Sequence, residues 1–406
     1  MKRIIFHIDV NNAFLSWSAI DLLKKGSKLD IRTIPSVVGG DEKKRTGIVV
    51  AKSFPAKKAG IVTGEPLYSA RRKVDKLYIV QTNKGSYEKY SNAFYELLCK
   101  YSPVIERYSI DECFMDMTGM ELIYDNLVDL AYKIKDEIYN TLGFTVNVGV
   151  GNSKLCAKMA SDFEKPNKVH TLFINEIKEK MWPLKVDDLF MVGKSSSSKL
   201  HQMGLNTIGD LAKADVKMLN KKFGKHGIQM WEYANGIDNS EVQYQLEKPK
   251  GVGNSITLPE NITEIEKLEE ILLALTEQVT YRLRRYELLA NTVNVQLRTK
   301  DFEDTSHQGK LIIATSSTKE IYGKAKQLLH QMFHRPMAIR LIGVRVDNLV
   351  EKEEQQLSLF YNDKTKKQEK LDKIVDELKN KYGYSKITRA GKMGVENLLK
   401  LKDIKK

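Results

Sequence analysis

The sequence has little of what marks a secreted, zinc-bound or membrane-embedded protein. Its three cysteines, Cys99, Cys113 and Cys156, are odd in number and widely spaced, with no Cys-x-x-Cys pair or nearby histidine set. This pattern argues against disulfide bonds and structural zinc, so we expect reduced, packed thiols. No apolar run approaches the roughly 20 residues of a membrane span, and the first one reaches Asp9 too soon for a signal peptide. We therefore predict a cytoplasmic protein that does not enter a membrane.

Acidic residues are also in deficit. The 406 residues include 66 Lys and Arg against 52 Asp and Glu, a formal net charge of +14. This balance favours a polyanionic partner, with nucleic acid as the first candidate and an anionic membrane surface as the second. Charge alone does not decide, because a basic protein can simply be well solvated. The hydrophobic fraction of 42% indicates a globular chain, and its length predicts roughly two to four domains.

Two adjacent acids, Asp111 and Glu112, lie between two apolar runs, 102–108 and 113–117, that predict the arms of a β-hairpin. Neighbouring side chains of a regular strand point to opposite faces, so the two acids can converge on one ligand only at a turn. Taken alone, the pair is more typical of a solvated turn, since Asp is a common turn residue.

The first predicted strand supplies a third acid. Residues 2–8 form an apolar run that ends at Asp9. The segment 29–76 is punctuated by Gly and Pro and holds 11 Lys and Arg against 5 Asp and Glu, so we treat it as a basic insertion. Without it, the order is strand, helix, strand, hairpin, helix, strand, which is ferredoxin-like and makes the first strand and the hairpin neighbours. Asp9 is then expected to face Asp111 and Glu112. The other expected elements are helix 13–23, strand 77–80, helix 86–101, helix 122–142 and strand 144–150.

The second half of the chain predicts a helical segment and then a second β-α-β-β-α-β unit. In the helical segment, 181–235, Gly193 opens a turn that can hold a DNA phosphate, but Ser195 replaces the usual second glycine and a plain helical turn is equally consistent. In the unit that follows, one sheet face should be covered by helices and the other should present polar side chains. That face suits a nucleic-acid backbone or plain solvent. The expected elements are strand 251–257, helix 264–289, strands 292–298 and 310–315, helix 318–333 and strand 339–349.

The tail beyond Leu349 is highly charged, and one apolar patch interrupts it. Gln356, Leu357, Leu359 and Phe360 suggest a docking peptide whose anchors fill a partner's pocket. Packing on their own domain is the alternative. A charged helix is expected over the last part of the tail, at 364–381.

Three carboxylates without His or Cys ligands make a hard oxygen site of the type that suits Mg²⁺. Two such ions, roughly 3.5–4 Å apart, can hold an attacking hydroxyl and a leaving pyrophosphate in line. The basic insertion fits this chemistry, because a triphosphate must be neutralised. The residues thus predict metal-dependent phosphoryl transfer on a nucleotide or nucleic acid.

Four motifs then carry a resemblance to a known family. They are His7-Ile8-Asp9-Val10-Asn11, Gly47 to Ala51 running on to Lys57, Tyr108-Ser109-Ile110-Asp111-Glu112, and Gly149 to Lys154 with Lys165-Pro166-Asn167 downstream. To about Phe360, the chain resembles a Y-family, translesion DNA polymerase of the bacterial polymerase IV and polymerase V type. The resemblance implies an α+β, multidomain right-hand polymerase with a ferredoxin-like palm. The implied parts are palm 1–28 and 77–175, small fingers 29–76, helical thumb 176–242, linker 243–250, β-α-β-β-α-β little finger 251–349, and tail 350–406.

The resemblance also implies roles for individual residues. Asp9, Asp111 and Glu112 would hold two Mg²⁺ ions as catalytic acids, with the carbonyl of Val10 as a further ligand. Phe14 falls at the steric gate, where its ring would collide with a ribose 2′-hydroxyl.

The nucleotide-binding residues depart in part from the family's pattern. The fingers of this family commonly use a Tyr and an Arg three residues apart, but Phe54 and Lys57 stand there. Phe54 lacks a hydroxyl and Lys57 offers a point charge instead of a bidentate fork, so we expect a weaker or differently arranged clamp. Lys165 matches a second phosphate-binding lysine.

The implied function is template-directed, low-fidelity, distributive DNA synthesis past damaged bases, without proofreading. The implied partners are primer-template DNA, deoxynucleoside triphosphates and the bacterial sliding clamp bound through 356–360, with the polymerase itself a cytoplasmic, nucleoid-associated monomer. The sequence leaves open whether accessory subunits are required. Two rivals remain. A catalytically idle DNA-binding adaptor would be free to lose the acids that are present here. A nucleotidyl cyclase shares palm topology but needs no template, and the basic thumb and little finger disfavour it.

Overall fold

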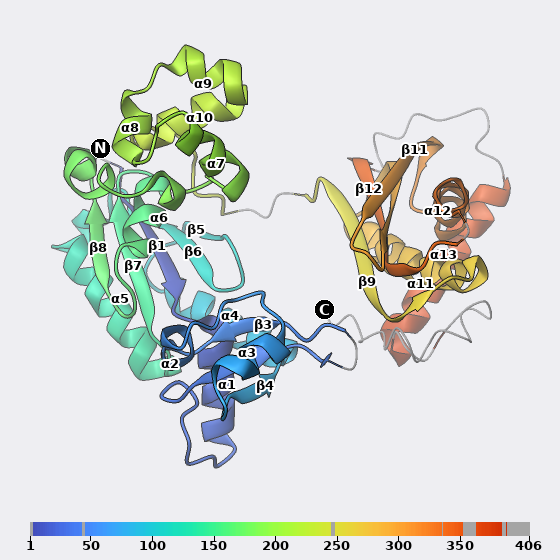
Figure 1. Cartoon of the computed structure of the whole chain (residues 1–406), viewed down its shortest axis with the longest axis horizontal. Helices are drawn as coiled ribbons and strands as arrows, with labels where there is room; N and C mark the ends of the chain where they lie inside the picture. The colour runs from blue at the N-terminus through green and yellow to red at the C-terminus, as the bar shows by residue number, and fades with distance from the viewer. Residues whose placement is uncertain are drawn as a thin grey trace. The chain divides into compact units, whose positions relative to one another are not determined.

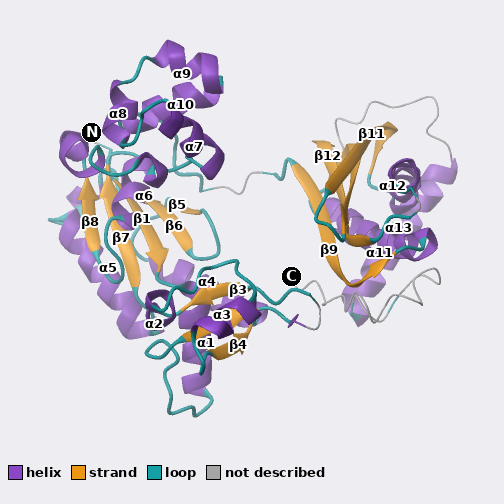
Figure 2. Ribbon diagram, in the orientation of Figure 1, coloured by secondary structure: helices purple, strands orange, loops and turns teal. Residues whose placement is uncertain are grey.

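The structure is a computed structural model that describes residues 3–42, 45–244, 248–334, 336–351, 363–383 and 387. The chain divides into two compact units. One comprises residues 1–40 and 48–246, and the other residues 247–406 together with the stretch 41–47. Each unit combines sheets with helices, as Figures 1 and 2 show. No helix in the described ranges is long and apolar enough to cross a lipid bilayer.

The larger sheet of the first unit carries the acids. Its strands run in the order β5-β6-β1-β7-β8, and β1 is antiparallel to both of its neighbours. Alternation along β1 sends Phe6, Ile8 and Val10 into a core shared with helices α1, α4 and α5. His7 and Asp9 point to the opposite face, where they meet α6. The bounds are β1 (Ile5–Val10), β5 (Ile105–Arg107), β6 (Glu112–Asp116), β7 (Val146–Gly151), β8 (Val169–Leu172), α1 (Ala13–Lys24), α4 (Lys84–Leu98), α5 (Leu127–Leu142) and α6 (Lys154–Asp162).

The predicted neighbourhood of the first strand and the hairpin is confirmed, but the strand expected at 77–80 lies in a different sheet. It forms as β4, which pairs in parallel with β2 in a small sheet of order β3-β2-β4. Both edges of β1 are already occupied by β6 and β7, so β4 extends the small sheet instead. The palm sheet gains β8, which was not among the expected strands. The small sheet and its helices are β2 (Ser36–Gly39), β3 (Val49–Lys52), β4 (Tyr78–Gln81), α2 (Phe54–Lys58) and α3 (Leu67–Lys73).

The segment after β8 is helical, as predicted. Gly193 is the N-cap of α7, and Gly224, at a positive φ of 63°, links α9 directly to α10. Leu200, Leu219 and Met230 are buried in the core that these helices share. The helices are α7 (Lys194–Gln202), α8 (Ile208–Lys213), α9 (Val216–Phe223) and α10 (Lys225–Ala234).

The second unit has a four-stranded antiparallel sheet of order β11-β10-β12-β9. Helices α11 and α12 cover one face, on which Val293, Val295 and Leu297 are buried. On the other face Asn294 and Gln296 line a hollow of about 330 Å³, which confirms the predicted alternation along this strand. The bounds are β9 (Gly251–Ile262), α11 (Ile265–Arg285), β10 (Leu288–Thr299), β11 (Asp304–Thr315), α12 (Thr318–Met332) and β12 (Ile339–Glu351).

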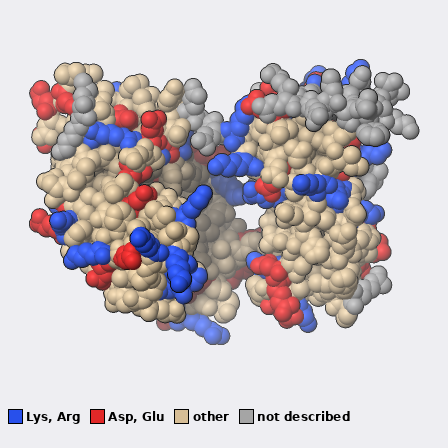
Figure 3. All heavy atoms as spheres, turned by 90° about the horizontal axis from the view of Figure 1, so that it is seen from above, with Lys and Arg blue, Asp and Glu red and all other residues tan. Residues whose placement is uncertain are grey.

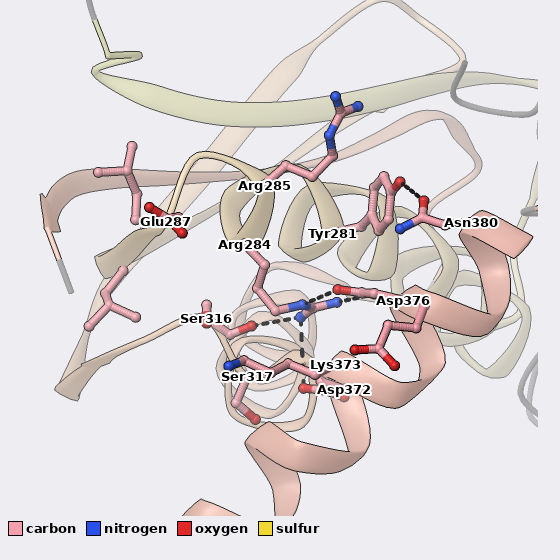
Figure 4. A pocket seen from close by; sticks show the side chains of 13 residues that line it. Tyr281, Arg284, Arg285, Glu287, Ser316, Ser317, Asp372, Lys373, Asp376 and Asn380 are labelled. Atoms are coloured by element: carbon pink, nitrogen blue, oxygen red, sulfur yellow. Dashed lines mark hydrogen bonds and ion pairs between the residues drawn. The ribbon is translucent and has the colours of Figure 1, made fainter. Parts of the chain in front are cut away.

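The predicted charged helix of the tail forms as α13 (Asp363–Tyr382), and polar contacts hold it against α11 and α12 (Figure 4). Arg284 of α11 donates hydrogen bonds of 2.6 and 2.8 Å to the two carboxylate oxygens of Asp376. Asp372 accepts a bond of 3.0 Å from the backbone N–H of Thr318, at the start of α12. A negative charge is favourable there because of the helix dipole. Helix α13 is thus fixed by specific charges.

Candidate active site

Asp9 and Glu112 lie side by side on neighbouring strands of the palm sheet. They are paired in the antiparallel register of β1 and β6, and their side chains are 13% and 17% exposed. Two carboxylates placed so close repel one another. Burial raises the pKa of Glu112; Lys158 opposes that rise and Asp9 adds to it.

Two lysines balance these charges. Lys158 Nζ lies 2.5 Å from Glu112 Oε1 and 3.7 Å from Asp9 Oδ2. Lys165 Nζ lies 2.9 Å from Asp9 Oδ2 and 2.8 Å from Asp162 Oδ1. Burial acts to lower the pKa of each lysine, but the facing carboxylates outweigh it and raise both pKa values. The acids and the two lysines therefore form one connected network of ion pairs.

Asp111 lies in the turn that leads into β6. Its backbone carbonyl accepts a hydrogen bond of 3.0 Å from the N–H of Val10, and its Oδ1 accepts one of 2.7 Å from the hydroxyl of Ser109. The first bond ties the turn to the end of β1, and the second is made within the turn and orients the Asp111 side chain. Because Asp111 precedes the strand, the strict alternation of side chains along a strand does not apply to it. Asp111 and Glu112 therefore lie at the same end of the sheet.

A cavity of about 430 Å³ opens at this end of the sheet, between the palm and the small fingers sheet. The palm wall comes from the end of β1, the start of α1 and the segment after α6. The fingers wall comes from β3 and the start of α2. Asp9 and Asp111 line the cavity together with three cations, Lys52, Lys57 and Lys165. A bound polyanion would therefore meet positive charge close to the acids.

Phe54 stands at the fingers wall, at the first position of α2. Ser53 caps this helix by accepting a hydrogen bond of 3.1 Å from the N–H of Ala56. The Phe54 ring is 53% exposed, and Lys58 Nζ lies 4.9 Å from its centre. The ring therefore offers an apolar surface to the cavity.

Lys52 is a cation of the fingers wall that the motifs did not single out. Its ammonium donates a hydrogen bond of 3.0 Å to the hydroxyl of Thr63. Burial and the charge of Lys57 lower the pKa of Lys52. Two mutually repelling lysines beside one cavity are a favourable place for a phosphate group.

Phe14 forms part of the palm wall. Its ring centre lies 4.8 Å from that of Tyr87 and 5.9 Å from that of Trp17. These aromatic contacts fix the ring of Phe14 where it lines the cavity.

The segment that carries Lys165 is fastened to the palm sheet by asparagines. Asn11 donates to Oδ1 of Asn147 at 3.1 Å and accepts a bond of 2.9 Å from the N–H of Asn167. Asn147 in turn donates to the carbonyl of Glu164 at 2.7 Å. The position of Lys165 is therefore set by β1 and β7.

The described residues of the site offer a divalent metal oxygen donors only. In the described part of the chain, no three His, Cys, Asp or Glu side chains are gathered closely enough to hold one ion as they stand. Asp9 and Glu112 are paired with lysines, and Asp111 with a hydroxyl. Oxygen donors nevertheless suit Mg²⁺, which keeps waters and takes further oxygens from substrate phosphates. The residues therefore fit an ion that is bound jointly with substrate.

Two cations at the site, Lys52 and Lys158, were not among the predicted residues. The signals for Lys52 were the charge surplus of the basic insertion and its place within the motif that runs from Gly47 to Lys57. Lys158 gave none, because a lysine four residues before an acid, here Asp162, is typical of a solvated helix face. Only the pairing of β1 with β6 shows what Lys158 contacts.

Comparison with known proteins decides the family. The model of the impB/mucB/samB family matches residues 8–162, that of its C-terminal domain residues 249–359, and that of the DNA polymerase-iota thumb domain residues 187–238. DNA polymerase IV of Clostridium acetobutylicum is 47% identical over 394 residues, covering 96% of this chain and 98% of the relative. DNA polymerase IV 2 of Bacillus subtilis is 33% identical over 400 residues, covering 97% and 95%. The chain belongs to the Y family of DNA polymerases.

Solved Y-family structures share its fold. The Y-family DNA polymerase chimera Dbh-Dpo4(243-245)-Dbh matches with a TM-score of 0.75 at 25% identity, covering 86% of this chain and 99% of that one. The insertion ternary complex of Dbh DNA polymerase matches with a TM-score of 0.59 at the same identity and coverage. The predicted fold class, a right-hand α+β polymerase with palm, fingers, thumb and little finger, is confirmed.

Within this Y-family fold, the described residues of the predicted site gather in one region. The predicted clamp-binding residues Gln356, Leu357, Leu359 and Phe360 lie outside the described residues. Glu112 adjoins the cavity through its contact with the Asp9–Lys158 network. The cavity itself is lined by all the other predicted site residues, Asp9, Val10, Phe14, Phe54, Lys57, Asp111 and Lys165.

Proposed function

We propose that this chain is a template-directed DNA polymerase that adds deoxynucleotides to a primer 3′ end, distributively and with low fidelity, and copies past damaged bases. One observation carries the proposal: the acids Asp9 and Asp111 and the cations Lys57 and Lys165 line a single cavity. Family membership supplies the reaction class. Phosphoryl transfer depends chiefly on positioning and on charge neutralisation, and these residues are placed for both.

The carboxylates of Asp9, Asp111 and Glu112 and the carbonyl of Val10 are the groups proposed to hold two Mg²⁺ ions. When bound, such ions neutralise phosphate charge and align the attacking hydroxyl with the leaving pyrophosphate. The protein's own contribution is to hold the acids at one end of the sheet. The β1–β6 register and the Ser109 hydrogen bond support this assignment.

The triphosphate is proposed to lie against Lys52, Lys57 and Lys165. Each ammonium offsets one negative charge, and none offers the bidentate geometry of arginine. Phe54 cannot donate a hydroxyl hydrogen bond, so point charges from three lysines replace the usual Tyr and Arg of the family's fingers. This arrangement neutralises charge while fixing phosphate orientation less strictly.

Phe14 is proposed to exclude ribonucleotides. Its ring lines the cavity and is held by Tyr87 and Trp17. A ring so fixed cannot move aside for a 2′-hydroxyl without losing those contacts. Selection of deoxynucleotides then follows from shape alone.

The polymer partner is proposed to be primer-template DNA, gripped by the thumb and by the open sheet face of the little finger. Asn294, Gln296 and Arg345 line the hollow on that face, and polar and basic side chains suit phosphate contacts that do not read sequence. Lys and Arg side chains are visible on both units in Figure 3. The protein is proposed to work in the cytoplasm as a monomer, with the sliding clamp as a further partner.

Primer extension tests the activity. Purified protein with primer-template, deoxynucleotides and Mg²⁺ should extend the primer opposite both undamaged and damaged template bases. Asp111→Ala should abolish extension. An inactive wild-type protein, or an Asp111→Ala variant as active as wild type, would refute the proposal.

The clamp contact needs its own test. Deleting residues 356–360 should leave distributive extension unchanged and remove stimulation by the bacterial sliding clamp. A control deletion of equal length in the tail, residues 388–392, should leave stimulation intact. Stimulation that survives loss of 356–360 would mean that the clamp binds elsewhere.

A further inference from the structure

Lys158 belongs to the acid pair and not to the cavity. Its side chain is 11% exposed and contacts the carboxylates of Glu112, Asp9 and Asp162, the last at 3.6 Å. It is absent from the cavity lining, whereas Lys165 is 35% exposed and lines the cavity. Both lysines contact Asp9 Oδ2, but only Lys165 also lines the cavity where a nucleotide is proposed to bind.

The position of Lys158 is fixed by the close packing of α6 on the palm sheet. A Cβ atom at Gly149 would lie 1.9 Å from the carbonyl oxygen of Ala157, and one at Gly151 would lie 2.7 Å from the Ala157 nitrogen. Only glycines allow the helix to lie so close to β7. The Ser161 hydroxyl also donates to the Lys158 carbonyl at 2.8 Å. The ammonium is therefore placed by the backbone of α6, and not by a mobile segment.

The Lys158 ammonium affects both the repulsion between the two acids and the binding of a divalent cation to them. Two facing, mostly buried carboxylates repel one another, and an ammonium within 4 Å of both offsets that repulsion. A divalent cation that binds the same oxygens meets the ammonium charge at short range. It must also compete for Glu112 Oε1, which Lys158 already holds. The ammonium thus acts against metal binding while it stabilises the acids.

We propose that Lys158 is a positioning residue, a built-in counter-cation that keeps Asp9 and Glu112 paired and lowers the affinity of the DNA-free and nucleotide-free protein for divalent cations. This inference rests on the proposed role of the acids as metal ligands. A triphosphate brings additional negative charge and oxygen donors. These favour binding of the divalent cation enough to overcome its repulsion by the Lys158 ammonium. Binding of the nucleotide should therefore strengthen binding of the divalent cation, and the reverse. The size of this positive coupling should depend on Lys158.

The test compares Lys158→Met with Lys154→Met on the same helix. Lys154 pairs with Glu106 at 2.6 Å, and both side chains are 14% exposed, so its loss removes a comparable ion pair that does not involve the proposed metal ligands. Mn²⁺ binding is measured by electron paramagnetic resonance on protein without DNA or nucleotide. Lys158→Met should bind Mn²⁺ more tightly, on the order of tenfold. Lys154→Met should bind it as wild type does.

Thermal unfolding provides the second readout. In EDTA, Lys158→Met should have a lower melting temperature than wild type. Mn²⁺ or Mg²⁺ should restore its melting temperature, because the cation replaces the missing charge between the acids. Lys154→Met should lose melting temperature under both conditions. Lys158→Arg keeps the charge and should behave like wild type in both measurements.

Two results would overturn the inference. One is Mn²⁺ binding by Lys158→Met that is no tighter than that of wild type, and the other is a melting temperature of Lys158→Met that stays low when metal is added. Either result makes Lys158 a member of an ordinary structural ion pair. Such a result with an active wild-type polymerase leaves the proposed function standing. Absence of primer extension by wild type is a separate failure, and Mn²⁺ binding that Asp9→Asn leaves unchanged would overturn both proposals.

Discussion

Asp9 of β1 lies directly opposite Glu112 of β6, and Lys158 Nζ lies within 4 Å of a carboxylate oxygen of each. In the chain, the fingers segment and several palm elements lie between these two acids. The pairing of β1 with β6 brings them together. Since both lie on the sheet face that α6 covers, a single helix residue can contact both. The chemistry proposed for this protein depends on that register.

Removing one charge from the acid pair should stop synthesis while preserving the fold. Glu112→Gln and Asp9→Asn keep the side-chain shape, and Lys158 and Lys165 can still donate to an amide oxygen. We expect the single-turnover rate of nucleotide addition to fall by at least roughly 10³-fold in each. Glu106→Gln, which loses a charge outside the site, is the control and should stay within a few-fold of wild type. A Glu112→Gln rate near that of the control would contradict the proposed role.

Replacing Phe14 by Ala should admit ribonucleotides. The ratio of kcat/KM for a ribonucleotide over its deoxy counterpart is expected to rise on the order of 10²-fold, because removal of the ring leaves room for a 2′-hydroxyl. The variant should also lose about 2 kcal/mol of unfolding free energy with the Tyr87 and Trp17 contacts. Phe54→Ala removes an exposed ring from the opposite wall and should leave sugar discrimination unchanged. If Phe14→Ala discriminates against ribonucleotides as strongly as wild type does, Phe14 is not the steric gate.

Lys52 should matter for nucleotide affinity. Lys52→Ala is expected to raise KM for deoxynucleotides roughly tenfold with a smaller change in kcat, since it removes a charge beside the phosphates and not at the reacting centre. Lys58→Ala removes a neighbouring lysine that contacts the Phe54 ring but is not part of the cavity lining, and its KM should stay close to that of wild type. Lys57→Arg should lower KM by supplying a bidentate donor. Equal KM values for Lys52→Ala and Lys58→Ala would argue that Lys52 does not touch the triphosphate.

A histidine in the thumb should respond to pH in a defined direction. His201 Nδ1 lies 2.9 Å from Asn206 Oδ1, and Nε2 lies 2.7 Å from Asp187 Oδ2. These partners raise the pKa of His201. Its stabilising contribution is therefore complete below about pH 6.5, the ordinary histidine value, and is lost as pH rises through the higher folded pKa. Titration by NMR should place the His201 midpoint above that ordinary value, and Asp187→Asn should lower it; a midpoint unmoved by Asp187→Asn would contradict the pairing.

The charged interface of α13 should contribute to the stability of the second unit. Lys379 pairs with Glu277 of α11 at 3.0 Å, with side chains 5% and 4% exposed. Lys379→Met should cost about 3 kcal/mol, because a buried carboxylate loses this ammonium, and adding Glu277→Met should recover much of the loss. Lys370→Met, at an exposed position of α13, is the matched control.

Hydrogen exchange is the suitable measurement for α13. Amides of α11 and α13 should exchange faster in Lys379→Met, and the double variant should restore protection. All three tryptophans, Trp17, Trp182 and Trp231, lie in the first unit, so tryptophan fluorescence should report unchanged unfolding there. Equal exchange in wild type and Lys379→Met would show that α13 does not depend on this pair.

Local patterns predicted much of the palm and the little finger. The alternation of Val293, Val295 and Leu297 with polar residues has the period of a half-buried strand. An apolar run ending at Asp9 and a hairpin with acids at its turn suffice to predict a cluster. The strand at 77–80 was identified correctly but assigned to the wrong sheet, because a short apolar strand does not record which edge it will join.

The sequence by itself determined the element order, the three acids at strand ends and the family motifs, because each depends on residue types at short, fixed spacings. Only the tertiary structure decided which cations meet those acids. Lys158 and Lys52 have ordinary sequence surroundings, and their partners come from strand pairing, from the close contact of α6 with Gly149 and Gly151, and from the meeting of fingers and palm. Charge interactions act through space, so the electrostatics of the site followed from the fold and not from the motifs.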